Sequence, residues 1–238
     1  MTTFVLLHGS WHGAWCWHKI FPRLEAAGHR AVVPDLPGRG RTPALPLAVG
    51  LETMVKSVAR LLPSTGKTTV VVHSRYGIVA STLAERFPDK IGQTIYLASF
   101  MLPHRKRVID YLPDHQSKLT GYVQVNRLAL CDWLDPAAYK EALYADCSEA
   151  DVGLARTLLV REPSRPALTR LTLREDNYGR VPRAYIRLTQ DAAVSIELQD
   201  RLLNLGTVDR VESIDAGHSA YFSKPDELTA TILKLSES

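Results

Sequence analysis

The sequence predicts an α/β fold, with a mostly parallel sheet that is covered by helices on both faces. Short apolar runs rich in β-branched residues alternate with longer segments whose apolar residues recur at helical spacing, which is the order that βαβ units produce. The chain also has 238 residues, of which 45% are hydrophobic. That is enough for one such domain with a small inserted lid.

The first half of the chain supplies most of the expected sheet. Strands are expected at residues 4–7, 31–33, 70–72 and 91–97. Helices are expected at residues 16–27, where Gly28 ends the helix, and at residues 51–62 and 78–87. Loops rich in glycine, tryptophan or proline follow the first two strands. These loops lie where parallel sheets bind ligands, beyond the carboxyl ends of the strands.

The alternation stops at about residue 100 and resumes at about residue 181. Residues 101–180 are expected to form a helical lid, inserted between two parts of one core at residues 1–100 and 181–238. Three short lid helices are expected at residues 125–134, 136–144 and 149–159. After the lid, strands at 183–188 and 208–214, a helix at 196–203 and a terminal helix from Lys224 complete the core.

Composition excludes several classes of protein. The net charge of +4 is mild and its basic residues are spread out, so no nucleic-acid partner is expected. No run approaches the roughly 20 apolar residues that span a bilayer, and the N-terminus lacks the features of a secretory signal. The expectation is therefore a cytoplasmic protein without a membrane partner. Cys16, Cys131 and Cys147 lie far apart, which argues against disulfide scaffolding and structural zinc.

Ser74 lies where the strand at residues 70–72 turns sharply into a helix. A serine on such a turn is lifted above the sheet, beside backbone amides that favour negative charge, as in a nucleophile elbow. The usual elbow is G-x-S-x-G, but Val72 and Tyr76 stand at the glycine positions, and the nearest glycine is Gly77. The alternative interpretation is a serine that caps the helix N-terminus.

Two further residues favour catalysis over capping. Asp191 follows the expected strand at 183–188, and His218 follows the strand at 208–214. Serine needs a base to become a nucleophile, histidine titrates in the right range, and a carboxylate orients the imidazole. The order Ser74, Asp191, His218, each at the carboxyl end of a strand, predicts a catalytic triad.

These residues belong to stretches that resemble the α/β-hydrolase superfamily over nearly the whole chain. Within it, the chain is similar to the branch that holds plant methyl-ester esterases, plant hydroxynitrile lyases and bacterial relatives. The resemblance rests on FVLLHGSWHGAWCWHKIFPRLEAAGHRAVVPDLPGRG, VVHSRYGIVASTLAERFPDKI, IYLASFMLP, YIRLTQDAAVS and DAGHSAYFSKP. The bacterial members usually carry glycine where this chain has Tyr76.

The resemblance implies roles for individual residues. Ser74 would be the nucleophile, His218 the base and Asp191 the carboxylate. The backbone N–H groups of Ser10 and Arg75 would form the oxyanion hole. The candidate substrate-binding residues are Gly9, Trp11, Tyr76 and Trp133. His73, directly before the nucleophile, would support the structure.

The expected activity is hydrolysis of a small carboxylic ester through an acyl-enzyme, with no metal or organic cofactor. The lyases of this branch need a threonine in the HG segment and a lysine after the catalytic histidine, whereas this chain has Gly9 and Ser219. Tyr76 keeps open a non-hydrolytic alternative on the same site, namely a lyase, an acyltransferase or a cofactor-free oxygenase. A binding module is the third hypothesis. The oligomeric state stays open, with a homodimer as one option.

Overall fold

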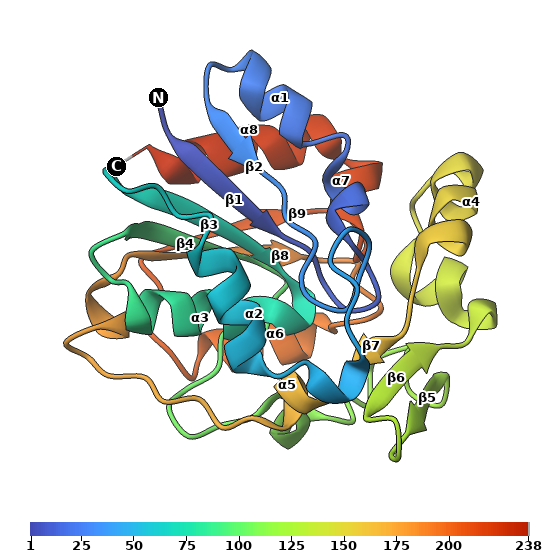
Figure 1. Ribbon diagram of the computed structural model, residues 1–238. Coiled ribbons are helices and arrows are strands. Elements are labelled where there is room, and N and C mark those ends of the chain that lie inside the picture. Colours follow the sequence, from blue (N-terminus) through green and yellow to red (C-terminus); the bar gives the residue numbers. More distant parts are fainter. Residues whose placement is uncertain (238) are drawn as a thin grey trace.

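The computed structural model describes residues 1–237 and contains a six-stranded parallel sheet in the order β2-β1-β3-β4-β8-β9 (Figure 1). The strands are β1 (Thr3–Leu7), β2 (Arg30–Val32), β3 (Thr68–His73), β4 (Ile91–Leu97), β8 (Arg183–Leu188) and β9 (Arg210–Ile214). The chain runs outward from β1 to β2 and then returns to place β3 on the other side of β1. This reversal makes the carboxyl ends of β1 and β3 the natural ligand site.

Helices cover both faces of the sheet, as the sequence predicts (Figure 1). α1 (Phe21–Ala26), α7 (Ala220–Ser223) and α8 (Pro225–Ser236) lie on one face. α2 (Leu51–Ala59), α3 (Gly77–Arg86) and α6 (Ile196–Leu203) lie on the other. The helix expected at residues 16–27 is instead a short 3-10 turn followed by α1, because Pro22 lacks an N–H and fits only the first turn of a helix.

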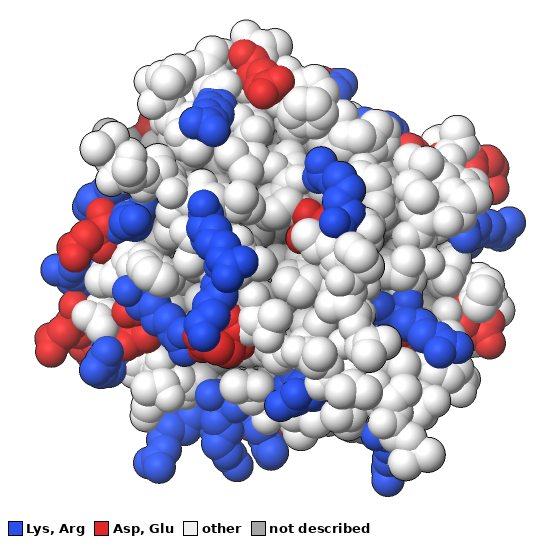
Figure 2. Space-filling view, in the orientation of Figure 1, with Lys and Arg blue, Asp and Glu red and all other residues white. Residues whose placement is uncertain are grey.

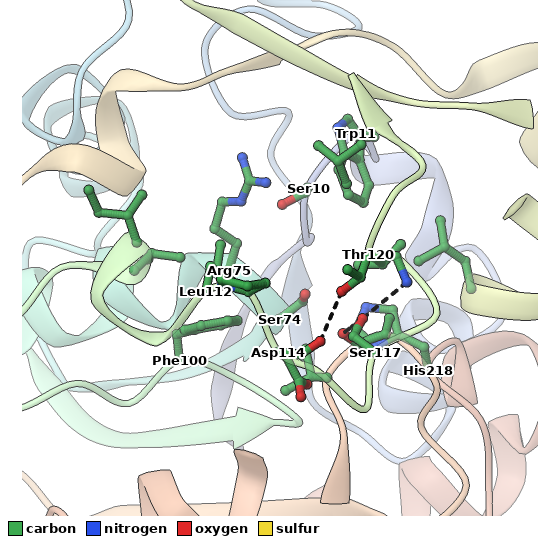
Figure 3. Close-up of a pocket in the computed structure, with 18 of the residues that line it drawn as sticks. Ser10, Trp11, Ser74, Arg75, Phe100, Leu112, Asp114, Ser117, Thr120 and His218 are labelled. Carbon is green, nitrogen blue, oxygen red and sulfur yellow. Dashed lines mark hydrogen bonds between the residues drawn. The ribbon is translucent and has the colours of Figure 1, made fainter. Parts of the chain in front are cut away.

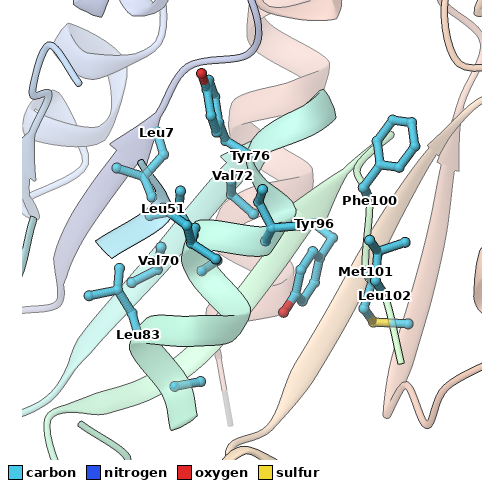
Figure 4. Close-up of a cluster of buried hydrophobic side chains, with 14 of the residues drawn as sticks. Leu7, Leu51, Val70, Val72, Tyr76, Leu83, Tyr96, Phe100, Met101 and Leu102 are labelled. Carbon is cyan, nitrogen blue, oxygen red and sulfur yellow. The ribbon is translucent and has the colours of Figure 1, made fainter. Parts of the chain in front are cut away.

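Side chains of the central strands alternate between the two faces. Val70 and Val72 of β3 point toward α2 and α3, where they join a cluster with Leu51 and Leu83 (Figure 4). Val71 belongs to the cluster on the opposite face. A strand buried on both sides reads as a continuous apolar run, which is why the sequence revealed β3 so clearly.

The segment between β4 and β8 is only partly helical, which corrects the expected helical lid. Residues 125–134 were expected to be a helix, but they fall within an antiparallel sheet of β5 (Val123–Asn126), β6 (Cys131–Leu134) and β7 (Glu162–Pro163). The Asn126 side chain accepts a hydrogen bond from the Ala129 N–H (2.9 Å) and so closes the tight turn between β5 and β6. The α-helices of the lid are α4 (Glu149–Leu158) and α5 (Arg165–Leu168).

Single-turn helices complete the described chain. They are η1 (Ala14–Trp17), η2 (Pro46–Ala48), η3 (Ser74–Tyr76), η4 (Val108–Tyr111), η5 (Pro136–Ala138), the π-helical η6 (Tyr139–Leu143) and η7 (Tyr178–Arg180). In Figure 2, acidic and basic side chains lie together at the left of this face, basic side chains predominate along its lower edge, and uncharged residues cover most of the rest. Among residues 1–237, no helix has both the length and the apolar content that crossing a membrane requires.

Candidate active site

Ser74 occupies a strained turn between β3 and α3. Its φ of 56° lies in the left-handed region, which costs free energy for a residue with a Cβ. The carbonyl of Ser74 is held by the Phe100 N–H at 3.0 Å and by the Ser99 hydroxyl at 2.6 Å. The side chain caps neither η3 nor α3, whose N-cap residues are His73 and Tyr76. The geometry is therefore that of an elbow and not that of a helix cap.

The elbow forms without the usual glycines because the steric demand falls one residue later. A Cβ at Gly77 would lie 2.5 Å from the carbonyl oxygen of Phe100, in the loop that follows β4. Only glycine lets α3 begin so close to that loop. Gly9 has a similar role on the other side, since a Cβ there would lie 2.8 Å from His73 Nδ1 and 3.0 Å from Ser74 Cβ.

His218 and Asp191 meet as the sequence predicts. Nδ1 of His218 lies 2.7 Å from Oδ2 of Asp191, and both residues are buried. The other oxygen of Asp191 accepts hydrogen bonds from the backbone N–H groups of Ala193 (2.7 Å) and Val194 (2.8 Å). These bonds keep the carboxylate in place. Because the Asp191 oxygen is an acceptor, Nδ1 of His218 carries a proton, and Nε2 is the nitrogen that can accept a second proton.

The loop that carries His218 is fixed from two sides. Nε2 of His73 donates to the carbonyl oxygen of His218 at 3.0 Å, and the two rings lie 4.3 Å apart. Burial holds the pKa of His73 well below its ordinary value of 6.5, so this imidazole stays neutral. From the lid, Asp146 accepts the Gly217 N–H at 2.8 Å. His73 is thus a structural support, in agreement with the sequence.

Ser74 and His218 open onto one cavity of about 660 Å³, between the sheet and the lid (Figure 3). Ser10, Trp11 and Arg75 also line it. Most of the remaining lining is apolar and includes Phe100, Val108, Leu112, Leu119, Leu143 and Val194. The sequence singled out none of these six. Only Phe100, which lies three residues after the strand at 91–97, could have been suggested by its position near a strand end.

Ser10 in the loop after β1 and Arg75 in η3, directly after Ser74, both line the cavity. Within the described chain, their backbone N–H groups donate no hydrogen bond, so both are available to a ligand. The Ser10 carbonyl oxygen receives a hydrogen bond from Nδ1 of His12 at 2.6 Å, and the other nitrogen of His12 lies 2.6 Å from the hydroxyl of Tyr144. Burial lowers the pKa of His12 to about 3, and the neutral ring braces this loop.

Three of the four candidate substrate-binding residues lie outside the cavity. Trp11 lines it, whereas Gly9, Tyr76 and Trp133 do not. Tyr76 is fully buried and donates its hydroxyl to Glu162. Trp133 lies on the lid beneath the guanidinium of Arg161, 5.1 Å from its ring centre. Gly9 instead packs against His73 and Ser74 in the core, whereas the positions of Tyr76 and Trp133 depend on how the lid folds. Across the described residues, no cluster of three or more acidic, histidine or cysteine side chains is placed to hold a metal ion.

The fold and the elbow define an α/β hydrolase, and comparison with known proteins agrees. The model of the alpha/beta hydrolase family matches residues 4–231, and the chain belongs to this family. It is 32% identical to "Methylesterase 7" of Arabidopsis thaliana, covering 98% of this chain and 96% of that protein. It is 34% identical to "Probable esterase PIR7A" of Oryza sativa, covering 98% of this chain and 95% of that protein.

Other relatives and solved structures agree with this membership. "Putative methylesterase 11, chloroplastic" of Arabidopsis thaliana is 32% identical over 98% of this chain, which spans 63% of that protein's length. The structure of the methylesterase MES16 from Arabidopsis is 27% identical with a TM-score of 0.86, covering 98% of each chain. A pyrethroid hydrolase from Sphingobium faniae has the same fold, with 24% identity, a TM-score of 0.91 and coverage of 100% and 98%.

Proposed function

We propose that this chain is a serine esterase that cleaves a carboxylic ester through an acyl-enzyme. One observation carries the proposal: Ser74, on its strained elbow, faces the same cavity as His218, whose Nδ1 is held by Asp191. The relatives named methylesterase and esterase, which cover nearly the whole chain, support this assignment.

The chemistry follows from the positions of these groups. Oγ of Ser74 attacks the ester carbonyl carbon while Nε2 of His218 takes the hydroxyl proton. The carbonyl oxygen becomes an oxyanion, which the N–H groups of Ser10 and Arg75 stabilise. The C–O bond then breaks, and His218 returns the proton to the leaving alcohol. Water, deprotonated by the same imidazole, attacks the acyl-enzyme, and Ser74 leaves with the proton to release the acid.

The cavity indicates what kind of ester fits. Its volume of about 660 Å³ lies within the range of pockets that bury a drug-sized ligand. Most of the lid residues that line it are apolar, and Asp114, Ser117, Thr120 and Arg127 add polar groups. A substrate with one bulky apolar group, attached at either the acyl or the alcohol side, would fill it. A short ester such as an acetate would leave most of the wall uncovered and bind weakly.

The non-hydrolytic alternative depended chiefly on Tyr76. The position of the Tyr76 side chain gives no support for this alternative. The phenol is fully buried, does not line the cavity and is engaged by Glu162. Burial raises the pKa of Tyr76 well above its ordinary value, so the side chain is a neutral hydroxyl outside the cavity lining. Ser219 and Gly9, in place of the residues that the lyases need, also favour hydrolysis.

The test is a comparison of the wild type with Ser74→Ala on a panel of methyl, aryl and short-chain esters, with acid and alcohol quantified. A fluorophosphonate probe should label the wild type at Ser74. Turnover should fall at least about 10⁴-fold in the variant, since the nucleophile is lost. A folded wild type that resists the probe, together with equal turnover by both proteins, would overturn the proposal.

A further inference from the structure

The polar groups of Trp11, which is next to the oxyanion donor Ser10, are held by the lid. The φ of Trp11, 60°, lies in the left-handed region, which a tryptophan adopts only when its surroundings enforce it. Its backbone N–H donates to Oε2 of Glu162 at 2.7 Å. Its indole N–H donates to Oδ1 of Asp132 at 2.9 Å, and its carbonyl accepts the Val160 N–H at 3.0 Å. All three polar groups of Trp11 are thus bound by lid residues.

The two carboxylates that hold Trp11 are neighbours in the lid sheet. Asp132 on β6 and Glu162 on β7 are partners in the antiparallel register. Each is neutralised by an arginine of the core. Arg75 contacts both oxygens of Asp132, at 3.0 and 3.3 Å, and Arg39 contacts Glu162. Both pairs are buried, so the loss of either arginine would leave a buried carboxylate without its ionic partner.

Tyr76 completes the site of Glu162. The phenol donates to Oε1 of Glu162, and its ring lies 5.1 Å from the guanidinium carbon of Arg39. Glu162 therefore receives Tyr76 and Arg39 on one oxygen and the Trp11 N–H on the other. Glycine at position 76 could supply neither the hydroxyl nor the ring. The elbow, the oxyanion loop and the lid meet at this one carboxylate.

We propose that Glu162, fixed by the Tyr76 hydroxyl, is a positioning residue for the oxyanion hole. It holds Trp11 in the left-handed conformation and thereby aims the N–H of the adjacent Ser10 at the cavity. Strand β7 of the lid is then part of the catalytic framework. A motion that lifted β7 away from Trp11 would therefore dismantle the oxyanion hole. This inference rests on the proposed serine esterase function.

Tyr76→Phe tests the inference with the smallest change, because the ring stays and only the hydroxyl is lost. We expect kcat to fall about 10-fold with KM changed less than about twofold, since a misplaced oxyanion donor weakens only the transition state. The rate of fluorophosphonate labelling at Ser74 should fall in the same proportion. Tyr96→Phe is the matched control: its buried hydroxyl contacts Ser81 at 2.9 Å, outside the cavity lining. It should label at the wild-type rate.

A second variant, Glu162→Gln, keeps the shape and removes the charge. We expect a loss of labelling rate of about 10- to 100-fold, short of the 10²–10³ for deleting a donor outright. Adding Tyr76→Phe should cost little more, because both act through one carboxylate. If Glu162→Gln does not fold, the labelling rate of Tyr76→Phe by itself tests the positioning role.

The two proposals fail in distinguishable ways. A wild type that neither labels nor cleaves any ester overturns the esterase function and this inference together. A wild type that labels, beside a folded Tyr76→Phe that labels equally fast, overturns only the role of Glu162 and Tyr76. Fully additive losses in the double variant would also contradict a shared action.

Discussion

In this chain the elbow requires a residue without a Cβ at Gly77, three residues after the serine. The usual elbow has this requirement two residues after the serine. The missing Cβ of Gly77 allows α3 to begin against the loop after β4, and the same loop holds the Ser74 carbonyl through the Phe100 N–H. Position 76 is thereby released from the need for glycine. A tyrosine occupies it and reaches the lid. The elbow is therefore kept without the G-x-S-x-G pattern, because the required glycine is at position 77 and not at position 76.

At this residue scale, Gly77→Ala should be strongly destabilising. The new Cβ would meet the backbone of Phe100 at 2.5 Å, and backbone cannot rotate away as a side chain can. We expect the free energy of unfolding to fall by about 1–3 kcal/mol or more, with ester turnover reduced. Gly153→Ala on α4 is the control, because its Cβ meets nothing within 4 Å. It should be neutral or gain up to about 1 kcal/mol. Equal effects in urea unfolding would contradict this account.

At the scale of the element, helix α6 fixes the loop that carries Asp191. Gln199 on α6 is fully buried, and its amide spans this loop. Oε1 accepts the Leu188 N–H at 3.0 Å, and Nε2 donates to the carbonyls of Leu188 (3.1 Å) and Val194 (2.9 Å). Leu188 ends β8, and Val194 donates its own N–H to Asp191. One side chain thus joins the strand end, the helix and the carboxylate loop.

Gln199→Leu keeps the approximate volume but leaves these backbone groups without partners. We expect a loss of about 2–4 kcal/mol in the free energy of unfolding, since an unsatisfied buried group costs about 1–3 kcal/mol. Turnover should fall as well, because the Asp191 loop loosens. Glu197→Ala changes an exposed residue of the same helix and should move stability by less than about 0.5 kcal/mol. Urea unfolding and ester kinetics measure both effects. An unchanged Gln199→Leu protein would refute the role assigned to this amide.

For the whole molecule, three neutral histidines are buried around the site. Burial holds the pKa values of His8 and His73 well below 6.5 and lowers that of His12 to about 3. Each ring has a structural contact: His8 accepts the Leu36 N–H at 3.1 Å, and the other two support the loops of Ser10 and His218. In the unfolded chain all three would titrate near 6.5. Below about pH 6.5, the folded state therefore binds fewer protons than the unfolded state.

This difference makes stability depend on pH in a definite direction. The depressed pKa values leave stability complete above about pH 6.5 and diminish it as pH falls below that value. Three protons give a limiting slope of about 4 kcal/mol per pH unit, so a domain of ordinary stability should unfold before about pH 4. Urea unfolding at pH 7, 6, 5.5 and 5 measures the slope, and NMR of the imidazoles checks that the three rings stay neutral at pH 5. A flat profile from pH 7 to pH 5 would contradict the prediction.

The sequence by itself predicted the six strands of the main sheet, their alternation with helices, and three polar residues that follow strand ends at one edge of that sheet. These are local patterns: a run of β-branched residues, a helical period, and a polar residue directly after a strand. Once parallel strands form, their carboxyl ends share an edge, so Asp191 and His218 meet although 27 residues separate them. The same local signals misled at residues 125–134, where good helix formers lie in a hairpin that only strand pairing can specify.

Only the tertiary structure decided which side chains line the cavity and what Tyr76 does. Trp11 and Glu162 are 151 residues apart, and Tyr76 and Glu162 are 86 apart. No local sequence pattern around these residues indicates that they are in contact. Their pairing depends on how the lid packs on the core, where buried charges are stable only beside their partners. Local periodicity specifies elements, whereas the partners of a buried polar group are fixed by the fold as a whole.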